Sequence, residues 1–169
     1  MKNIYLVGMP GSGKSTLGRL IAQEMKRVFM DTDEEIRKRF GCTPEQIILL
    51  QGEEKLREVE KELLSKLLSE SGLIISTGGG FPVYNENMKL MNKSGITVYL
   101  HYDVSDLWER LENDRKRPLS SSLKSTESLL NKRENIYKEA QINLCGAEDL
   151  ELNLTQILGL IRERFPEEF

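Results

Sequence analysis

The sequence is poor in cysteine, has no long hydrophobic run and carries no surplus of basic residues. Its two cysteines, Cys42 and Cys145, have no cysteine nearby in the sequence, which fits a reduced, cytoplasmic protein rather than a disulfide scaffold. No apolar stretch reaches the roughly 18 residues that a membrane-spanning helix needs. Lysine and arginine number 24 against 27 acidic residues, a formal net charge of −3, which argues against a nucleic-acid-binding protein. We therefore expect neither a membrane nor a nucleic-acid partner.

Internal repeats and low-complexity tracts are absent as well, and 169 residues fit one domain. A chain of this length buries roughly 70% of the surface of its unfolded state, so it needs no disulfide or metal in order to fold. We expect a single domain over residues 1–169 that acts as a monomer.

What the sequence does contain is a glycine-rich segment near its start, Gly8-Met9-Pro10-Gly11-Ser12-Gly13-Lys14-Ser15. This segment matches G-x-x-x-x-G-K-[ST], the pattern of the phosphate-binding P-loop. The apolar run at residues 4–7 indicates a buried strand before it, and the apolar spacing over residues 17–21 indicates a helix behind it. Strand, glycine loop and helix together form the context that the motif requires.

The residue types in this loop suit a nucleoside triphosphate. Gly8, Gly11 and Gly13 let the backbone turn its N–H groups inward around an anion, and the helix that begins near Lys14 adds its own unpaired N–H groups. Lys14 brings a positive charge to the β- and γ-phosphates, and the Ser15 hydroxyl can ligate Mg²⁺. A chance glycine-rich turn is the weaker alternative because a strand and a helix flank the loop.

Short apolar runs alternate with longer segments of helical periodicity along the rest of the chain. The runs predict strands at residues 3–8, 28–31, 73–77, 96–101 and 141–145, and the clearest helix is predicted over residues 53–70. This alternation predicts an α/β fold with a parallel sheet covered by helices on both faces. Ligands of such sheets bind at the carboxyl ends of the strands. The P-loop, Asp31-Thr32-Asp33 and Gly78-Gly79-Gly80 follow the first three strands, so we expect them to meet at one edge.

Asp31 and Asp33 lie two residues apart, just past the second predicted strand. At the period of a strand the two side chains point the same way. Asp31 would then support Mg²⁺ through its water shell, and Asp33 would hydrogen-bond to, or accept a proton from, a substrate hydroxyl. The alternative is a pair of surface or helix-capping aspartates, because residues 34–36 read as a helix start. The sequence leaves both interpretations open.

Two arginines precede a polar partner at helical spacing: Arg57 lies three residues before Glu60, and Arg133 lies four before Tyr137. Glu60 can hold the Arg57 guanidinium for bidentate capture of a carboxylate. An exposed ion pair of little energetic value is the commoner alternative, and Arg133 poses the same choice. The triplet Gly78-Gly79-Gly80 offers a backbone surface that a ligand can approach closely, and the cost of ordering three glycines makes an ordinary turn the weaker interpretation.

Residues 112–126 are polar, basic at the front and rich in serine behind, and Pro118 interrupts any helix there. An ordinary solvated connection is one interpretation. Because a P-loop is present, we favour a mobile lid that carries arginines to the transferring phosphate.

The motifs that follow the P-loop occur in a fixed order: Phe29-x-Asp31-x-Asp33, Gly52-Glu53-x-x-x-Arg57-x-x-Glu60, Gly78-Gly79-Gly80, Arg117-Pro118-Leu119 and Arg133-x-x-x-Tyr137. In this order and spacing the chain resembles shikimate kinase, a family of small P-loop kinases related to the nucleoside monophosphate kinases, over nearly all of its length. The resemblance implies a three-layer α/β/α fold with a five-stranded parallel sheet in the order 2-3-1-4-5 and a lid. It also implies that ATP·Mg²⁺ phosphorylates the 3-hydroxyl of shikimate, on the route to chorismate and the aromatic amino acids.

The resemblance further implies roles for individual residues. Ser15 and Asp31 serve the metal, Asp33 is the candidate base, and Lys14 and Arg117 complete the catalytic set, with Arg117 closing over the phosphates from the lid. The nucleotide-binding set is Gly11, Ser12, Gly13, Lys14, Ser15, Thr16, Arg110 and Arg117, with Arg110 as the adenine-stacking residue. The substrate-binding set is Asp33, Arg57, Gly78, Gly79, Gly80 and Arg133, and the shikimate-binding segment spans about residues 32–60.

The chain departs from the family at three places. Leu56 stands where the family often has phenylalanine, Ile48 stands at another wall position in place of an aromatic residue, and residues 146–149 lack the basic residue of the family's adenine loop. These changes imply a reshaped pocket and remove no catalytic group.

Three other functions are compatible with a P-loop. A kinase of another small metabolite, such as gluconate, is the nearest, and a nucleoside monophosphate kinase is less favoured because the substrate-side arginines are few. A non-catalytic nucleotide switch would have no reason to combine Asp33, Arg57 and Arg133.

Overall fold

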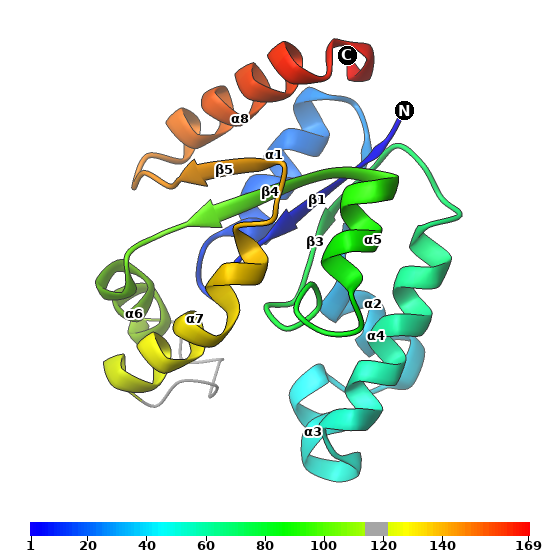
Figure 1. The fold of residues 1–169 in the computed structure, drawn as a ribbon, viewed down its shortest axis with the longest axis vertical. Coiled ribbons are helices and arrows are strands. Elements are labelled where there is room, and N and C mark those ends of the chain that lie inside the picture. The colour runs from blue at the N-terminus through cyan, green and yellow to red at the C-terminus, as the bar shows by residue number, and fades with distance from the viewer. Residues whose placement is uncertain (114–121) are drawn as a thin grey trace.

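A five-stranded parallel sheet forms the centre of the protein in the computed structural model, which describes residues 1–113 and 122–169 (Figure 1). The strands are β1 (Asn3–Val7), β2 (Val28–Asp31), β3 (Leu73–Ser76), β4 (Gly95–His101) and β5 (Ile142–Cys145). They lie in the order β2-β3-β1-β4-β5, and every neighbouring pair is parallel. The predicted fold class and strand order are confirmed, and each predicted strand agrees with the observed one to within about a residue at either end.

Helices cover both faces of this sheet. They are α1 (Lys14–Glu24), α2 (Thr32–Phe40), α3 (Pro44–Gln51), α4 (Glu53–Leu67), α5 (Asn87–Ser94), α6 (Val104–Asn113), α7 (Leu123–Tyr137) and α8 (Leu150–Arg164), followed by the short 3₁₀ helix η1 (Pro166–Glu168). Helices α1 and α8 lie on one face, whereas α4, α5 and α7 lie on the other (Figure 1). None of the helices in the described ranges has the length and apolar character to cross a bilayer.

The central strands are apolar on both faces because helices bury both of them. Ile4, Tyr5, Leu6 and Val7 of β1 are fully buried, which is the pattern expected of a parallel strand with a helical layer on each side. The predicted helix over 53–70 is α4, whose leucine face is buried and which ends at Leu67, about one turn earlier than predicted. This core fixes the carboxyl ends of β1, β2 and β3 at one edge of the sheet.

The predicted lid lies mostly outside the described residues. Glu112 and Asn113 end α6, and residues 123–126 begin α7 behind the cap Ser122, whose side chain accepts a hydrogen bond from the Ser125 backbone N–H. This capping box explains why the helix starts inside the segment that composition alone marks as a connection. Residues 114–121, which include Arg117, are outside the described ranges, so the lid and its arginine stay predictions.

At the opposite edge of the sheet, a buried ion pair joins the two ends of the described chain. Arg27 and Glu168 meet at 3.0 Å, and each side chain is only 2% exposed. Glu168 also accepts a hydrogen bond from the Lys2 backbone N–H at 2.7 Å, while Arg27 donates to the Lys2 carbonyl at 2.9 Å. The pair therefore links the start of β1, the α1–β2 turn and η1.

Replacing Glu168 with alanine leaves the Arg27 guanidinium buried without its countercharge. We expect the free energy of unfolding, measured by urea denaturation, to fall by about 3 kcal/mol or more. Glu167→Ala is the matched control in the same turn, because it removes only the exposed 3.5 Å pair with Lys2 and should cost about 1 kcal/mol or less. Equal losses in the two variants would contradict the assignment of the buried pair as a stabilising link.

Candidate active site

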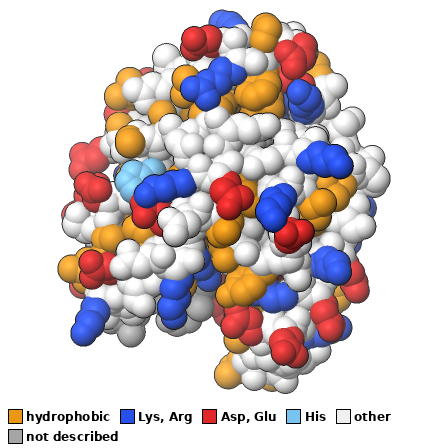
Figure 2. Space-filling model, in the orientation of Figure 1, with side chains coloured by type: hydrophobic (Ala, Val, Ile, Leu, Met, Phe, Trp, Pro, Cys, Tyr) orange, Lys and Arg blue, Asp and Glu red, His pale blue; other side chains and the backbone are white. Residues whose placement is uncertain are grey.

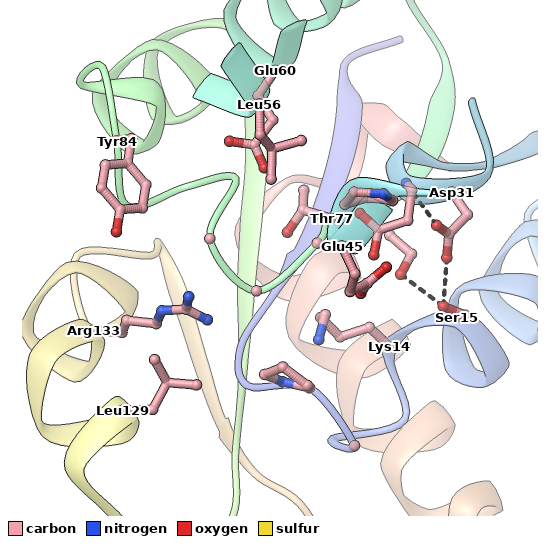
Figure 3. Close-up of a pocket in the computed structure, with 18 of the residues that line it drawn as sticks. Lys14, Ser15, Asp31, Glu45, Leu56, Glu60, Thr77, Tyr84, Leu129 and Arg133 are labelled. Atoms are coloured by element: carbon pink, nitrogen blue, oxygen red, sulfur yellow. Dashed lines mark hydrogen bonds between the residues drawn. The ribbon is translucent and has the colours of Figure 1, made fainter. Parts of the chain in front are cut away.

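A cavity of about 620 Å³ opens at the carboxyl edge of the sheet. The space-filling view shows a notch between the α6–α7 side and the α3–α4 side of the molecule (Figure 2). The cavity is lined by the P-loop, by the starts of α2 and α3, by α4, by the glycine triplet after β3, by Arg110 of α6 and by α7 (Figure 3). The three segments predicted to converge from the sequence therefore do so.

The P-loop has the backbone that anion binding requires. Gly11 and Gly13 both have φ of 83°, a left-handed conformation that side-chain-bearing residues rarely adopt. Gly13 is the N-cap of α1, and no side chain caps the first turn of this helix. The Lys14 ammonium is buried within the loop, 2.8 Å from the Met9 carbonyl oxygen and 3.0 Å from that of Gly8. A positive charge and the positive end of a helix dipole thus face the same side of the cavity.

Asp31 differs from the expectation for a strand residue. The strand ends at Asp31 and α2 begins at Thr32, so the argument that Asp31 and Asp33 point the same way at a period of two is wrong. Asp31 caps α2 instead: its Oδ1 accepts from the N–H groups of Asp33 at 3.0 Å and Glu34 at 3.3 Å. Its Oδ2 accepts from the Ser15 hydroxyl at 2.6 Å. The capping interpretation therefore holds for Asp31, and its role toward Mg²⁺ stays a prediction.

Ser76 is a polar residue of this corner that the sequence analysis missed. It is the last residue of β3, it pairs in register with Asp31 of β2, and it is 1% exposed. Its hydroxyl lies 3.0 Å from that of Ser15. A buried polar residue at the carboxyl end of a strand was the available signal. The dashed lines in Figure 3 show Ser15 between these two partners.

Asp33 lies in the first turn of α2, against the glycine triplet. A side chain at Gly78 would overlap the Asp33 carboxylate and displace it, so glycine leaves the space that this carboxylate occupies. The Gly78 backbone N–H donates to the Thr32 hydroxyl at 2.9 Å, which ties the triplet to the same turn of helix. The close approach of backbone and carboxylate places Asp33 on the wall of the cavity.

Arg57 is held by two carboxylates. Its Nη1 donates to Glu60 at 2.6 Å and its Nη2 donates to Glu53 at 2.7 Å. The alternative of an exposed ion pair with Glu60 is wrong, because the two side chains are only 12% and 4% exposed. A side chain at Gly80 would come within 2.6 Å of Nη1, so this glycine leaves the space that the guanidinium fills.

Burial and charge act in opposite directions on this pair. Burial raises the pKa of the Glu60 carboxyl above its ordinary value, and the cations Arg57 and Arg133 lower it part of the way back. Burial also lowers the pKa of Arg57, but Glu60 and Glu53 outweigh this effect and raise it overall. The guanidinium therefore remains a fixed cation in the cavity wall.

Arg133 and Tyr137 reach the triplet from α7. Tyr137 is fully buried, and its hydroxyl donates to the Gly79 carbonyl at 2.6 Å. Burial raises the pKa of Tyr137 to about 12, so the hydroxyl stays a donor at neutral pH. A side chain at Gly79 would come within 2.9 Å of Arg133 Nη1 and of Pro10. In Figure 3 the guanidinium of Arg133 points toward the triplet, so both predicted arginines line one end of the cavity.

Arg110 stacks against an aromatic ring at the nucleotide side of the cavity. Its Cζ lies 4.1 Å from the centre of the Tyr102 ring. The Tyr102 hydroxyl bonds to the Ala147 carbonyl at 3.1 Å, and Asn153 of α8 donates to the same two oxygens. Asn153 therefore fixes the loop at residues 146–149, the loop that has no basic residue. The sequence analysis did not identify this asparagine.

Ile48 and Leu56, the two positions expected to reshape the pocket, both line the cavity. Glu45 and Tyr84 also line the cavity and were not predicted, since no motif marks either of them. Figure 3 shows both directed at the cavity from segments outside the P-loop. Their places follow from how α3 and the loop after the triplet fold back over the site.

Comparison with known proteins agrees with the resemblance stated from the motifs. Residues 10–161 match a family model described as shikimate kinase. A shikimate kinase of Persephonella marina is 38% identical over 165 residues, which cover 96% of this chain and all of the relative. The structure of a shikimate kinase from Acinetobacter baumannii in complex with shikimate is 32% identical, with a TM-score of 0.91 over 98% of this chain and 95% of that one.

A gluconokinase from Sinorhizobium meliloti has a more distant similarity. It is 18% identical, with a TM-score of 0.66 over 96% of this chain and 92% of that one. At this identity the similarity extends to the fold alone. The gluconate alternative therefore gains no support from it.

Gly80→Ala tests the contact between the triplet and Arg57. The new methyl group would come within 2.6 Å of Nη1, so the guanidinium must leave its place, while the backbone φ is acceptable for alanine. We expect the KM for shikimate, the substrate that the resemblance implies, to rise roughly tenfold or more, since a charge-assisted hydrogen bond is worth about 1.5–3 kcal/mol.

Gly159→Ala is the control for this variant, because a methyl group there meets nothing within 4 Å on helix α8. Steady-state kinetics of both variants provide the comparison. An unchanged KM in Gly80→Ala would show that the place of Arg57 does not depend on this glycine.

Proposed function

The chain belongs to the shikimate kinase family, and we propose that it transfers the terminal phosphoryl group of Mg·ATP to the 3-hydroxyl of shikimate in this cavity. One observation carries the proposal. A single cavity combines a P-loop at one end, two arginines at the other and Asp33 between them. This is the order in which a triphosphate, an acceptor hydroxyl and a carboxylate must lie for the transfer to occur.

Shikimate is a compact cyclic anion with three hydroxyl groups. Its carboxylate is bound by Arg57 and Arg133, and the rigid ion pair with Glu60 reduces the entropy that Arg57 would otherwise lose. The ring lies between Leu56 and Ile48 and the backbone of the triplet. This pose brings the hydroxyl end to Asp33, so the substrate is oriented by charge at one end and hydrogen bonding at the other.

The nucleotide is bound by residues 11–16. Their backbone N–H groups and the N-terminus of α1 donate hydrogen bonds to the phosphate oxygens. When the nucleotide binds, the Lys14 ammonium gives up its hydrogen bonds to the loop carbonyls and contacts the β- and γ-phosphates instead. Arg110 offers its other face to the base, since Tyr102 already occupies one face. Arg117, which lies outside the described residues, closes over the phosphates as the lid residue.

The residues present fit Mg²⁺. Ser15 and Asp31 present hard oxygen atoms 2.6 Å apart beside the P-loop. Within residues 1–113 and 122–169, no three His, Cys, Asp or Glu side chains gather as a metal site. Mg²⁺ in kinases is bound by one or two protein oxygens together with phosphates and water, so this sparse donor set is suitable. When bound, the ion neutralises charge on the phosphate oxygens.

Asp33 orients the acceptor hydroxyl toward the γ-phosphate and takes its proton late in the transfer. The transition state of phosphoryl transfer is loose, so positioning and charge neutralisation supply most of the rate and the proton transfer contributes modestly. The acceptor oxygen bonds to the γ-phosphorus as the bond from that phosphorus to the bridging oxygen breaks, and ADP leaves with the electron pair of the broken bond.

A coupled assay of ADP release tests the proposed reaction. Mg·ATP is offered with shikimate, with gluconate or with neither. We expect turnover with shikimate alone, because the cavity provides fixed cations for a carboxylate and an acceptor for ring hydroxyls. Turnover with gluconate alone, or with neither compound, would contradict the proposed substrate while leaving the P-loop assignment intact.

Asp33→Asn tests the role of the aspartate. The amide retains the size of the side chain but cannot accept the proton, so we expect kcat to fall by about 10²-fold or more while the affinity for a non-hydrolysable ATP analogue is retained. Glu34→Gln is the matched control, because the Glu34 side chain forms an exposed pair with Arg19 at 3.6 Å and does not line the cavity. If Asp33→Asn turned over like the control, Asp33 would have no part in the chemistry.

A further inference from the structure

Tyr84 lies in the loop between β3 and α5, four residues past the last glycine of the triplet. No motif and none of the roles described above includes it. Its side chain lines the cavity although it is 36% exposed. Figure 3 shows the ring at the arginine end, with its hydroxyl directed toward the side from which Arg133 enters.

The Tyr84 ring covers the guanidinium of Arg57. The Arg57 Cζ lies 3.8 Å from the ring centre, which is a close cation–π contact. Gly80 lies against the guanidinium as well, so the glycine backbone and the tyrosine ring limit the movement of Arg57. Glu60 and Glu53 hold the two Nη atoms of the guanidinium by hydrogen bonds, and the Tyr84 ring restrains the orientation of the guanidinium plane.

Tyr84 also acts on the Glu53 carboxyl, which holds Arg57 at 2.7 Å. Hydrogen bonds from Arg57 first, and from Tyr84 next, lower the pKa of the Glu53 carboxyl. Glu53 is more than half exposed, so its hold on Arg57 depends on being restrained by another group. Tyr84 therefore acts on Arg57 both directly and through Glu53.

Tyr84 also gives the cavity an aromatic surface. It is the one aromatic side chain among the described residues that line the cavity, where Ile48 and Leu56 supply only aliphatic surface. An aromatic face beside a fixed cation suits a substrate that has a flat, partly apolar ring with a carboxylate attached. An open-chain polyol acid cannot use such a face equally well.

We propose that Tyr84 is a substrate-binding residue that determines specificity for a carboxylated cyclic polyol. Its ring packs against the ring of the substrate and keeps the Arg57 guanidinium in the plane that receives the carboxylate. This inference rests on the proposed phosphorylation of shikimate and adds a residue that selects the substrate.

Tyr84→Leu and Tyr84→Phe, compared with the wild type, test the proposal. We expect Tyr84→Leu to raise the KM for shikimate about tenfold, and to weaken shikimate binding in calorimetry without nucleotide to the same extent. The kcat and the KM for ATP should stay within about twofold, because no phosphate contact is removed. Tyr84→Phe keeps the ring and should stay within about threefold of the wild-type KM.

The side chain is partly exposed and lies in a loop, so neither variant should unfold, and the melting temperature checks this. Phe40→Leu is the matched control: Phe40 is an aromatic residue of α2 with 44% exposure that does not line the cavity. A Tyr84→Leu variant with wild-type KM would overturn the proposal. So would a Tyr84→Phe variant as impaired as Tyr84→Leu, since the hydroxyl alone would then be responsible. If the wild type itself neither bound nor phosphorylated shikimate, the proposed function would fail instead.

Discussion

The site depends on the close approach of three side chains to a glycine backbone. Gly78, Gly79 and Gly80 leave the space that Asp33, Arg133 and Arg57, respectively, occupy. These three side chains come from α2, α7 and α4, and no two of these helices are consecutive in the sequence. Because the triplet continues directly from β3, its position is set by the central sheet. The rigid core therefore fixes the distances between these three side chains.

Charges of both signs line the cavity. Lys14 and the α1 N-terminus are positive, Asp31 and Asp33 are negative, and Arg57 and Arg133 are positive. Each charge has support behind it: Glu60 lies behind Arg57, and Ser15 and the α2 backbone hold Asp31. Such support costs stability, since Glu60 is buried, but it removes the need for the site to reorganise during the transfer. The wall residues then need only match the shape of the substrate.

Apolar periodicity and the glycine motifs, which are local signals, predicted the strands and the edge at which the P-loop, Asp33 and the glycine triplet meet, whereas the sheet order was implied by the resemblance to shikimate kinase. The sequence also predicted the ion pair of Arg57 with Glu60 from their spacing on one helix. The argument that Asp31 and Asp33 point the same way failed, because α2 begins at Thr32, whereas the helix-capping alternative was right for Asp31. Ser76, Tyr84 and Asn153 were missed because their partners lie on other elements, and such contacts exist only in the folded chain. The role of Arg117 stays a prediction.

The strand order has a kinetic consequence. The P-loop strand β1 is the middle strand, yet its neighbours are made much later: Ile4 pairs with Ile74 on one side and Ile96 on the other. Contacts of such large sequence separation slow folding, because a long loop must be closed before they form. During synthesis β1 must wait for β3 and β4 before it is enclosed, so nucleotide cannot stabilise the nascent chain until most of the sheet has emerged. Phosphate binding is thus a property of the completed topology, although its motif precedes β3 and β4 in the sequence.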